Sequence, residues 1–225
     1  MINDPRMQLL HTPTLADVLD TFGVWGVIDT RVVPMNDVRG PIFGSAYTVR
    51  WSPVRKPRDI MAAQPSTWDD VKNFLAPEIT CGRGKIYVGG VDNGLLTELA
   101  LAGGFSASDF QLRGFEGVIL GGAIRDAHVI KQLELPVWAT NFTPADTQGN
   151  FKVAEAGTAC SILGVTIRTG DLIVADASGC VVVPQDLIND VLTRAFEIEQ
   201  KEKVIFDRVS SGERLWNVVH DLGRI

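Results

Sequence analysis

The segment Gly117-Val-Ile-Leu-Gly-Gly-Ala-Ile-Arg-Asp126 decides both the fold class and the candidate site. Its apolar run, Val118 to Leu120, is bounded by glycines and predicts a buried strand. Arg125 and Asp126 follow side by side. Two charged side chains at the end of such a strand are costly to bury unless each has a partner. That partner could be a ligand or a metal ion.

Apolar strand-like runs alternate with helical patterns on both sides of this segment. The first helix is expected to have its N-cap at Thr14 and to end at Gly23. The sequence predicts strands at 39–51, 85–91, 117–120, 136–138, 160–167, 172–175 and 180–183, helices at 93–102, 107–113, 126–133 and 187–209, a partly helical stretch at 60–76, and loops at 55–58 and 142–149. The closely spaced strands at 160–183 argue against a purely parallel sheet. With no repeat or linker, we expect one α/β domain with mixed sheets over residues 1–225.

Composition excludes several classes of protein. The chain has 225 residues, 45% of them hydrophobic, which is enough for a sizeable core. The formal net charge of −6 argues against a basic nucleic-acid-binding surface and against binding to an anionic membrane. No apolar run approaches the roughly 18–20 residues of a membrane span. Residues 1–10 include Asp4, Pro5 and Arg6 and no long apolar run, so we expect no secretory signal.

Cysteines and histidines give little support for a metal site. They are few and scattered: Cys81, Cys160, Cys180, His11, His128 and His220. An odd number of cysteines without a Cys-x-x-Cys pair indicates reduced thiols, and we expect a cytoplasmic protein. Zinc ligands at the usual spacings are absent from the sequence. A carboxylate site for a hard cation remains open.

Arg125 and Asp126 have two interpretations. In the functional one, the guanidinium of Arg125 binds a carboxylate or an enolate oxygen, and Asp126 holds a divalent cation such as Mg²⁺. In the structural one, Asp126 lies at the start of a helix and Arg125 pairs with a surface acid.

The segment Gly103-Gly104-Phe105-Ser106 also has two interpretations. Its free backbone amides could converge on an anion at the start of a helix. Alternatively, Gly103 is the C-cap of one helix and Ser106 the N-cap of the next. The Gly-Gly pairs at 89–90 and 121–122 lack the spacing of nucleotide-binding motifs, so a nucleotide cradle is disfavoured.

Other charged residues have ordinary explanations. The acids of the 187–209 helix, Glu197, Glu199 and Glu202, lie among lysines and indicate a solvated face. His128 suits an exposed helix face, and Asp176 suits a turn.

Together these segments resemble the RraA-like family, which includes the 4-hydroxy-4-methyl-2-oxoglutarate/4-carboxy-4-hydroxy-2-oxoadipate aldolases. The resemblance spans about residues 14–200. Its matching segments are Leu15–Asp20, Gly40–Val49, Gly103, Arg113–Asp126 and Gly170–Pro184.

The resemblance implies a swivelling-type α/β/β domain assembled as a trimer or a hexamer. It implies that Arg125 binds the pyruvyl part of a 2-oxo acid, that Asp126 holds Mg²⁺ or Mn²⁺, and that the segment Gly103, Gly104, Phe105 and Ser106 binds the substrate carboxylate. It also implies that the C-terminal helix and tail, about 185–225, pack on a neighbouring subunit. An acid of that helix, Glu199 or Glu202, would then line the neighbour's site.

Two positions depart from the family pattern. Gly104 stands where the family loop often has an acid, and Val129 stands where the aldolase signature has one, three residues after Asp126. Both differences remove negative charge beside the expected metal. The Arg125-Asp126 pair remains, so the resemblance predicts a ligand and metal site and leaves the substrate open.

Two functions follow from these observations. The first is a metal-dependent carbon–carbon lyase that releases pyruvate from a 2-oxo acid by retro-aldol cleavage or decarboxylation. The second is a non-catalytic regulator that binds ribonuclease E or another protein. A protein that only regulates has no need of Arg125-Asp126, so the pair favours the lyase.

Overall fold

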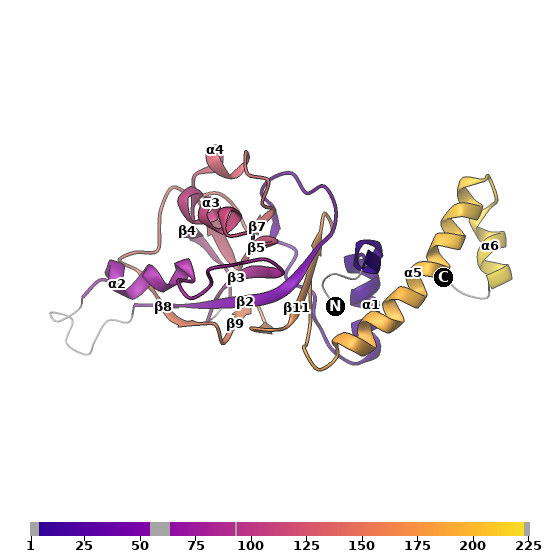
Figure 1. Cartoon of the computed structure of the whole chain (residues 1–225), viewed down its shortest axis with the longest axis horizontal. Helices are drawn as coiled ribbons and strands as arrows, with labels where there is room; N and C mark the ends of the chain where they lie inside the picture. Colours follow the sequence, from indigo (N-terminus) through magenta and orange to yellow (C-terminus); the bar gives the residue numbers. More distant parts are fainter. Residues whose placement is uncertain (1–4, 55–63, 93, 223–225) are drawn as a thin grey trace.

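A computed structural model describes residues 5–54, 64–92 and 94–222 (Figure 1). The expected loop at 55–58 and the beginning of the 60–76 stretch therefore lie outside the described residues. The rest of that stretch contains α2 (Trp68–Val71) and the 3-10 turn η3 (Lys72–Leu75). A further 3-10 turn, η1 (Pro5–Leu9), precedes the first helix.

The main sheet is mixed, as the sequence predicts. Its strands are β1 (Val33–Pro34), β2 (Ile42–Pro53), β3 (Lys85–Val91), β5 (Gly117–Leu120), β7 (Val137–Ala139), β8 (Phe151–Ala156), β11 (Leu172–Asp176) and β12 (Gly179–Val183). They are ordered β1-β7-β5-β3-β2-β11-β12, and β8 also pairs with β2. The pairs β2–β3, β3–β5 and β5–β7 are parallel, and the other pairs are antiparallel. The opening segment supplies β5, which is buried along its whole length.

Two small ribbons accompany this sheet. β9 (Ala159–Ile162) and β10 (Val165–Arg168) form an antiparallel hairpin, and β4 (Leu96–Ala102) pairs in parallel with β6 (Gly122–Ile124). The helix predicted at 93–102 is therefore wrong over the described residues 96–102. Its leucines and alanines favour a helix, but pairing with β6 and burial of its last residues outweigh that local preference.

The two faces of the sheet bury different partners. Side chains alternate along β3, so Tyr87 faces α3 (Gly104–Leu112) and α4 (Ala127–Ile130), whereas Ile86 and Val88 face the β9–β10 hairpin. Tyr87 stacks on Phe110 of α3, with ring centroids 4.4 Å apart. α3 and α4 thus cover the face of the sheet that also carries β4 and β6 (Figure 1).

A third apolar cluster joins α1 (Thr12–Thr21) and α5 (Ile188–Ser210) to β11 and β12. The N-cap expected at Thr14 is wrong, because the helix begins at Thr12. Buried Asp176 at the end of β11 explains the earlier start: its carboxylate accepts hydrogen bonds from the Thr12 N–H at 2.9 Å and the Thr12 hydroxyl at 2.8 Å. Asp176 also accepts the Ser178 N–H, which is the turn role expected for it.

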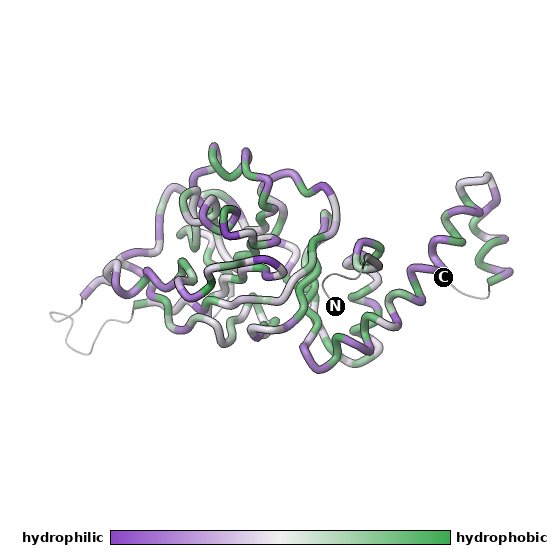
Figure 2. Tube along the Cα trace, viewed as in Figure 1, coloured by the Kyte–Doolittle hydropathy of each residue, from purple (hydrophilic) through white to green (hydrophobic). Residues whose placement is uncertain are grey.

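Past Phe196, α5 has no fully buried side chain. Its outer part leaves the rest of the chain, and α6 (Leu215–Leu222) folds back against it (Figure 1). Hydrophobic residues recur along both helices (Figure 2). The large exposed ones are Val204, Phe206, Val209, Leu215, Trp216 and Leu222. Within the described ranges, none of the helices combines the length and apolar content needed to cross a membrane.

Candidate functional site

Parallel pairing of β4 with β6 brings the two candidate segments together. Ala102, the last residue of β4, lies opposite Ile124, the last residue of β6. The Arg125 N–H donates to the Ala102 carbonyl oxygen at 3.1 Å. Residues 103–121 therefore connect two parallel strands that end at the same edge.

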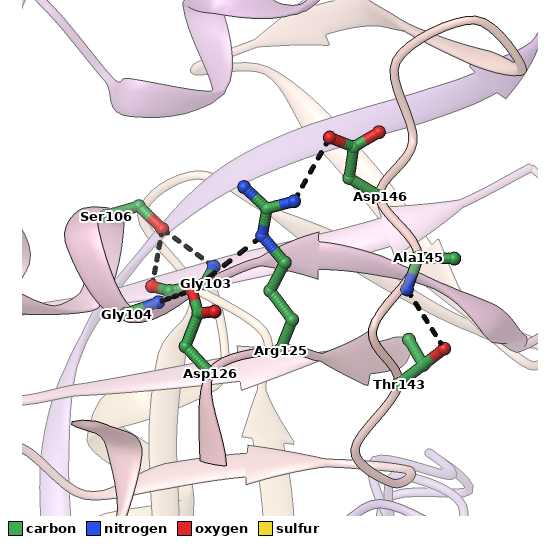
Figure 3. A network of polar contacts seen from close by, with 8 residues as sticks. All are labelled: Gly103, Gly104, Ser106, Arg125, Asp126, Thr143, Ala145 and Asp146. Carbon is green, nitrogen blue, oxygen red and sulfur yellow. Dashed lines mark hydrogen bonds and ion pairs between the residues drawn. The ribbon is translucent and has the colours of Figure 1, made fainter. Parts of the chain in front are cut away.

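Asp126 contacts Gly104 and Arg125 through one carboxylate oxygen, and its backbone conformation is unusual. Its Oδ2 accepts the Gly104 N–H at 2.8 Å and lies 3.7 Å from Nε of Arg125 (Figure 3). Its backbone is left-handed, with φ 61° and ψ 50°, at the N-cap of α4. An aspartate tolerates this region better than most residues but is still strained there, and such strain concentrates at functional sites.

Position 103 requires glycine, because its backbone passes close to the side chains of Arg125 and Asp126. A Cβ built on Gly103 would lie 2.8 Å from Oδ2 of Asp126 and 2.9 Å from Cγ of Arg125. α3 begins at Gly104, so the structural alternative, a C-cap at Gly103 and an N-cap at Ser106, is wrong. Instead the Ser106 hydroxyl accepts the Gly103 N–H and donates to the Gly103 carbonyl oxygen, both at 3.0 Å.

Asp146 is a charged residue at the site that the sequence did not indicate. Its Oδ2 lies 3.1 Å from an Nη nitrogen of Arg125. The 142–149 loop that carries it is fixed to β4, because the Ala100 N–H donates to the Ala145 carbonyl oxygen at 2.9 Å. Figure 3 shows the Arg125 guanidinium between Asp126 and Asp146. The polarity of the loop was visible in the sequence, but its proximity to Arg125 arises from the fold.

A cavity of about 250 Å³ opens beside these residues. Its polar lining includes Gly103, Ser106, Arg125, Asp126 and Asp146. The rest of its wall is largely apolar, contributed by Trp51, Trp68, Val71, Phe74, Leu75 and Leu101. Pockets for drug-sized ligands hold about 300–1,000 Å³, so this cavity suits a small ligand.

Phe105 also lines the cavity, but its side chain is 91% exposed. Gly104 and Val129, the two departures from the family pattern, lie against each other: a Cβ on Gly104 would be 3.0 Å from Cβ of Val129 and 3.1 Å from Cβ of Asp126. An acid at each position would add two carboxylates beside Asp126.

The acids of α5 lie away from this cavity in the single chain. Glu199 accepts the His11 N–H at 3.2 Å and the Thr14 hydroxyl at 2.7 Å, so it ties α5 to the start of α1. Burial, followed by the charges of Glu199 and Asp17, raises the pKa of Glu202. A role for Glu199 or Glu202 in a neighbour's site stays a prediction.

The chain belongs to the RraA-like family. The family model, described as Aldolase/RraA, matches residues 12–182. An uncharacterised protein of Methanocaldococcus jannaschii is 29% identical, over 91% of this chain and 93% of its own. A Pseudomonas aeruginosa protein, provisionally described as a 4-hydroxy-4-methyl-2-oxoglutarate aldolase, is 37% identical, but the match covers only 47% of this chain and 64% of that protein.

Solved structures agree with the family's fold. An uncharacterised protein from Pseudomonas syringae superposes with a TM-score of 0.76 and 26% identity, over 95% of this chain and 94% of its own. Streptomyces coelicolor RraAS2, described as an unusual member of the RNase ES inhibitor RraA family, gives a TM-score of 0.73 at 24% identity, over 91% and 96% of the two chains. The mixed α/β architecture is thus that of RraA proteins.

Proposed function

We propose that this protein is a divalent-metal-dependent lyase that cleaves a 2-oxo acid and releases pyruvate. The observation that carries the proposal is the convergence of Arg125, Asp126 and the start of α3 on one small cavity. The name of the P. aeruginosa relative supports an aldolase within the family.

Arg125 would bind the substrate and stabilise negative charge. Its guanidinium is held by Asp146 on one side and lies near Asp126 on the other. A fixed cation beside the 2-oxo group favours the oxyanion that develops as the carbon–carbon bond breaks. Asp146 therefore positions Arg125 before the substrate arrives.

The start of α3 would bind the substrate carboxylate. The N–H groups of Gly103 and Gly104 already have acceptors, Ser106 and Asp126. We therefore assign the carboxylate to the next N–H groups of the first helical turn, those of Phe105 and Ser106, which by position have no acceptor within the helix.

Asp126 would hold the metal. Oδ2 of Asp126 is fixed by Gly104, which leaves Oδ1 to face a cation. Mg²⁺ commonly takes one or two protein carboxylates and keeps several waters, so one fixed carboxylate is a suitable donor. In the described part of the chain, no three acids, histidines or cysteines cluster closely enough to form a fuller metal site. A bound Mg²⁺ or Mn²⁺ would polarise the 2-oxo group as a Lewis acid.

Pyruvate release tests this proposal. Purified protein is assayed with oxaloacetate, with 4-hydroxy-4-methyl-2-oxoglutarate and with the monocarboxylate 4-hydroxy-2-oxo-4-phenylbutyrate, in Mg²⁺, in Mn²⁺ and in EDTA. We expect metal-dependent pyruvate from at least one of these acids, and Arg125→Ala should reduce it by a factor of about 100 or more. Arg31→Ala is the matched control, because Arg31 forms an exposed pair with Asp29 at 2.7 Å and lies outside the cavity. Absence of metal-dependent pyruvate from all three acids would refute the lyase.

The regulator hypothesis predicts a different result. A protein that only binds ribonuclease E would retain that binding when Arg125 is replaced, and would release no pyruvate. A pull-down with purified ribonuclease E, using the chain and its Arg125→Ala variant, separates the two functions. We favour the lyase, because regulation gives no reason for a strained Asp126 beside a cavity.

We also propose that the protein assembles as a trimer or a hexamer through α5 and α6. The exposed apolar residues that gather on these two packed helices, among them Phe206 and Trp216, support self-association, because clustered exposed apolar side chains mark interaction surfaces. Light scattering after gel filtration would measure the assembly. Phe206→Asp should shift it toward the monomer.

A further inference from the structure

The wall of the cavity opposite its charged residues is made of aromatic and aliphatic side chains. Trp51, in β2, and Phe74, in η3, meet with ring centroids 5.7 Å apart. The register of β2 against β8 shifts between Arg50 and Trp51, so the strand pairing is irregular beside the cavity. Trp68 and Val71 of α2 add to the same lining. A ligand that fills this cavity therefore buries apolar surface.

The charges in the cavity select against a second carboxylate on the ligand. Among the residues that line it, all within the described ranges, the charged ones are Arg125, Asp126 and Asp146. Arg125 is the single cation among these described lining residues, and Asp146 already pairs with it at 3.1 Å. One ligand carboxylate can use Arg125 and the start of α3. A second carboxylate would meet indole and phenyl rings or a like-charged aspartate. Neither environment compensates for the hydration that the carboxylate loses on burial.

Trp51 contributes a fully buried indole to this wall. The residue is 1% exposed, and its indole Nε1, which has no hydrogen-bond acceptor among the described residues, has almost no accessible surface. A ligand in the cavity therefore meets the ring of Trp51 and not its N–H.

We propose that the cavity takes 4-hydroxy-2-oxo monocarboxylic acids with an aliphatic or aromatic group at C4. The inference rests on the proposed lyase function and names its substrate class. In the cleavage, the C3–C4 bond breaks and its electron pair passes to the pyruvyl fragment. The C4 hydroxyl loses its proton to solvent and becomes the carbonyl of an apolar aldehyde, and C3 takes up a proton to give pyruvate. The two products together contain the same atoms and electrons as the substrate, so no oxidant or reductant is needed.

Binding tests the substrate class without depending on turnover. Calorimetry in Mg²⁺ compares phenylpyruvate, which carries an aromatic group, with 2-oxoglutarate, which carries a second carboxylate. We expect the Kd of phenylpyruvate to be at least tenfold lower, since burial of about 60 Å² of apolar surface corresponds to roughly tenfold in affinity. Equal affinities, tighter binding of 2-oxoglutarate, or no binding of phenylpyruvate would overturn the inference.

Two variants place the preference at the wall. Trp68→Ala should remove most of the phenylpyruvate advantage while leaving the Kd of pyruvate unchanged. Trp51→Phe keeps an aromatic wall, so the phenylpyruvate advantage should persist in that variant. Trp25, which is 74% exposed and outside the cavity, gives the matched controls Trp25→Ala and Trp25→Phe. Thermal unfolding checks that each variant folds.

Turnover then separates the two proposals. Pyruvate release from 4-hydroxy-2-oxo-4-phenylbutyrate is compared with release from 4-hydroxy-4-methyl-2-oxoglutarate. Preference for the phenyl substrate supports both proposals. Preference for the dicarboxylate keeps the lyase and overturns the substrate class. Tight phenylpyruvate binding with no pyruvate from either substrate refutes the lyase and keeps the apolar preference of the cavity.

Discussion

Substitutions of Gly104 test directly whether a metal ion binds at Asp126. We compare Gly104→Ala with Gly104→Asp. Both introduce the same Cβ, which would lie 3.0 Å from Cβ of Val129 and 3.1 Å from Cβ of Asp126. Such overpacking costs about 1–3 kcal/mol. The gain from removing a helical glycine, about 1 kcal/mol, offsets part of it. The alanine variant should therefore lose about 0–2 kcal/mol.

The aspartate variant adds a charge effect. Its carboxylate would lie about 4 Å from that of Asp126, where like charges repel by up to roughly 4 kcal/mol at an effective dielectric constant of 20. Asp126 is 35% exposed, so solvent reduces this repulsion. The new carboxylate also lies at the N-terminus of α3, where the helix dipole stabilises a negative charge by about 0.3–1 kcal/mol. In EDTA we expect Gly104→Asp to be about 1 kcal/mol less stable than Gly104→Ala.

Mg²⁺ should reverse that order. A cation that binds the folded state at about ten times its Kd adds roughly 1.4 kcal/mol of stability. Two adjacent carboxylates bind Mg²⁺ better than one, so Gly104→Asp should gain more stability than Gly104→Ala. Urea unfolding of both variants, in EDTA and in Mg²⁺, measures the free energies. The same order in both solutions would refute the placement of the metal at Asp126.

Three further predictions address other parts of the molecule. Arg125→Lys should lower kcat/KM by about tenfold or more with little change in Tm, because lysine lacks the planar fork and Arg125 is 38% exposed. Asp176→Asn should lower the free energy of unfolding by about 1–3 kcal/mol in urea titrations, since buried Asp176 accepts both hydrogen bonds from Thr12. Exposed Cys81 should react with a thiol reagent in the native protein. Burial raises the pKa of the Cys160 thiol to about 12, so the two buried cysteines, Cys160 and Cys180, should react only after unfolding. More than one fast thiol in the native chain would contradict the last prediction.

The strands β3 and β5 can be predicted from the sequence, because the apolar pattern that indicates them is local. β5 is a continuous apolar run between glycines, and β3 carries the apolar run Ile86 to Val88 ahead of Gly89-Gly90; the structure confirms both strands. The local pattern of β4 predicts a helix, since its leucines and alanines favour one in isolation. Its pairing partner, β6, lies about twenty residues further along the chain. That pairing, which the local pattern could not reveal, decides the conformation.

The candidate site likewise contains residues that the sequence predicts and residues that only the fold brings together. Arg125 and Asp126 could be proposed from the sequence because they directly follow the strand residues of β5 and β6. Asp146 could not, since its contact with Arg125 depends on how the 142–149 loop lies on β4. The aromatic wall likewise combines β2, α2 and η3, which are separate in sequence.

Substrate choice within the family would depend on different residues from the reaction itself. In the proposed lyase, the Arg125-Asp126 motif would supply the reacting groups, so relatives that share the motif could share the chemistry. The far end of a ligand would meet Trp51, Trp68 and the 142–149 loop, which line the cavity and lie outside the motif. Substitution there would change what fits without disturbing the cation or the fixed carboxylate. An aldolase name transferred along the motif would therefore support the type of bond cleaved, while the cavity wall, whose described residues include a single cation, would determine which acid is cleaved.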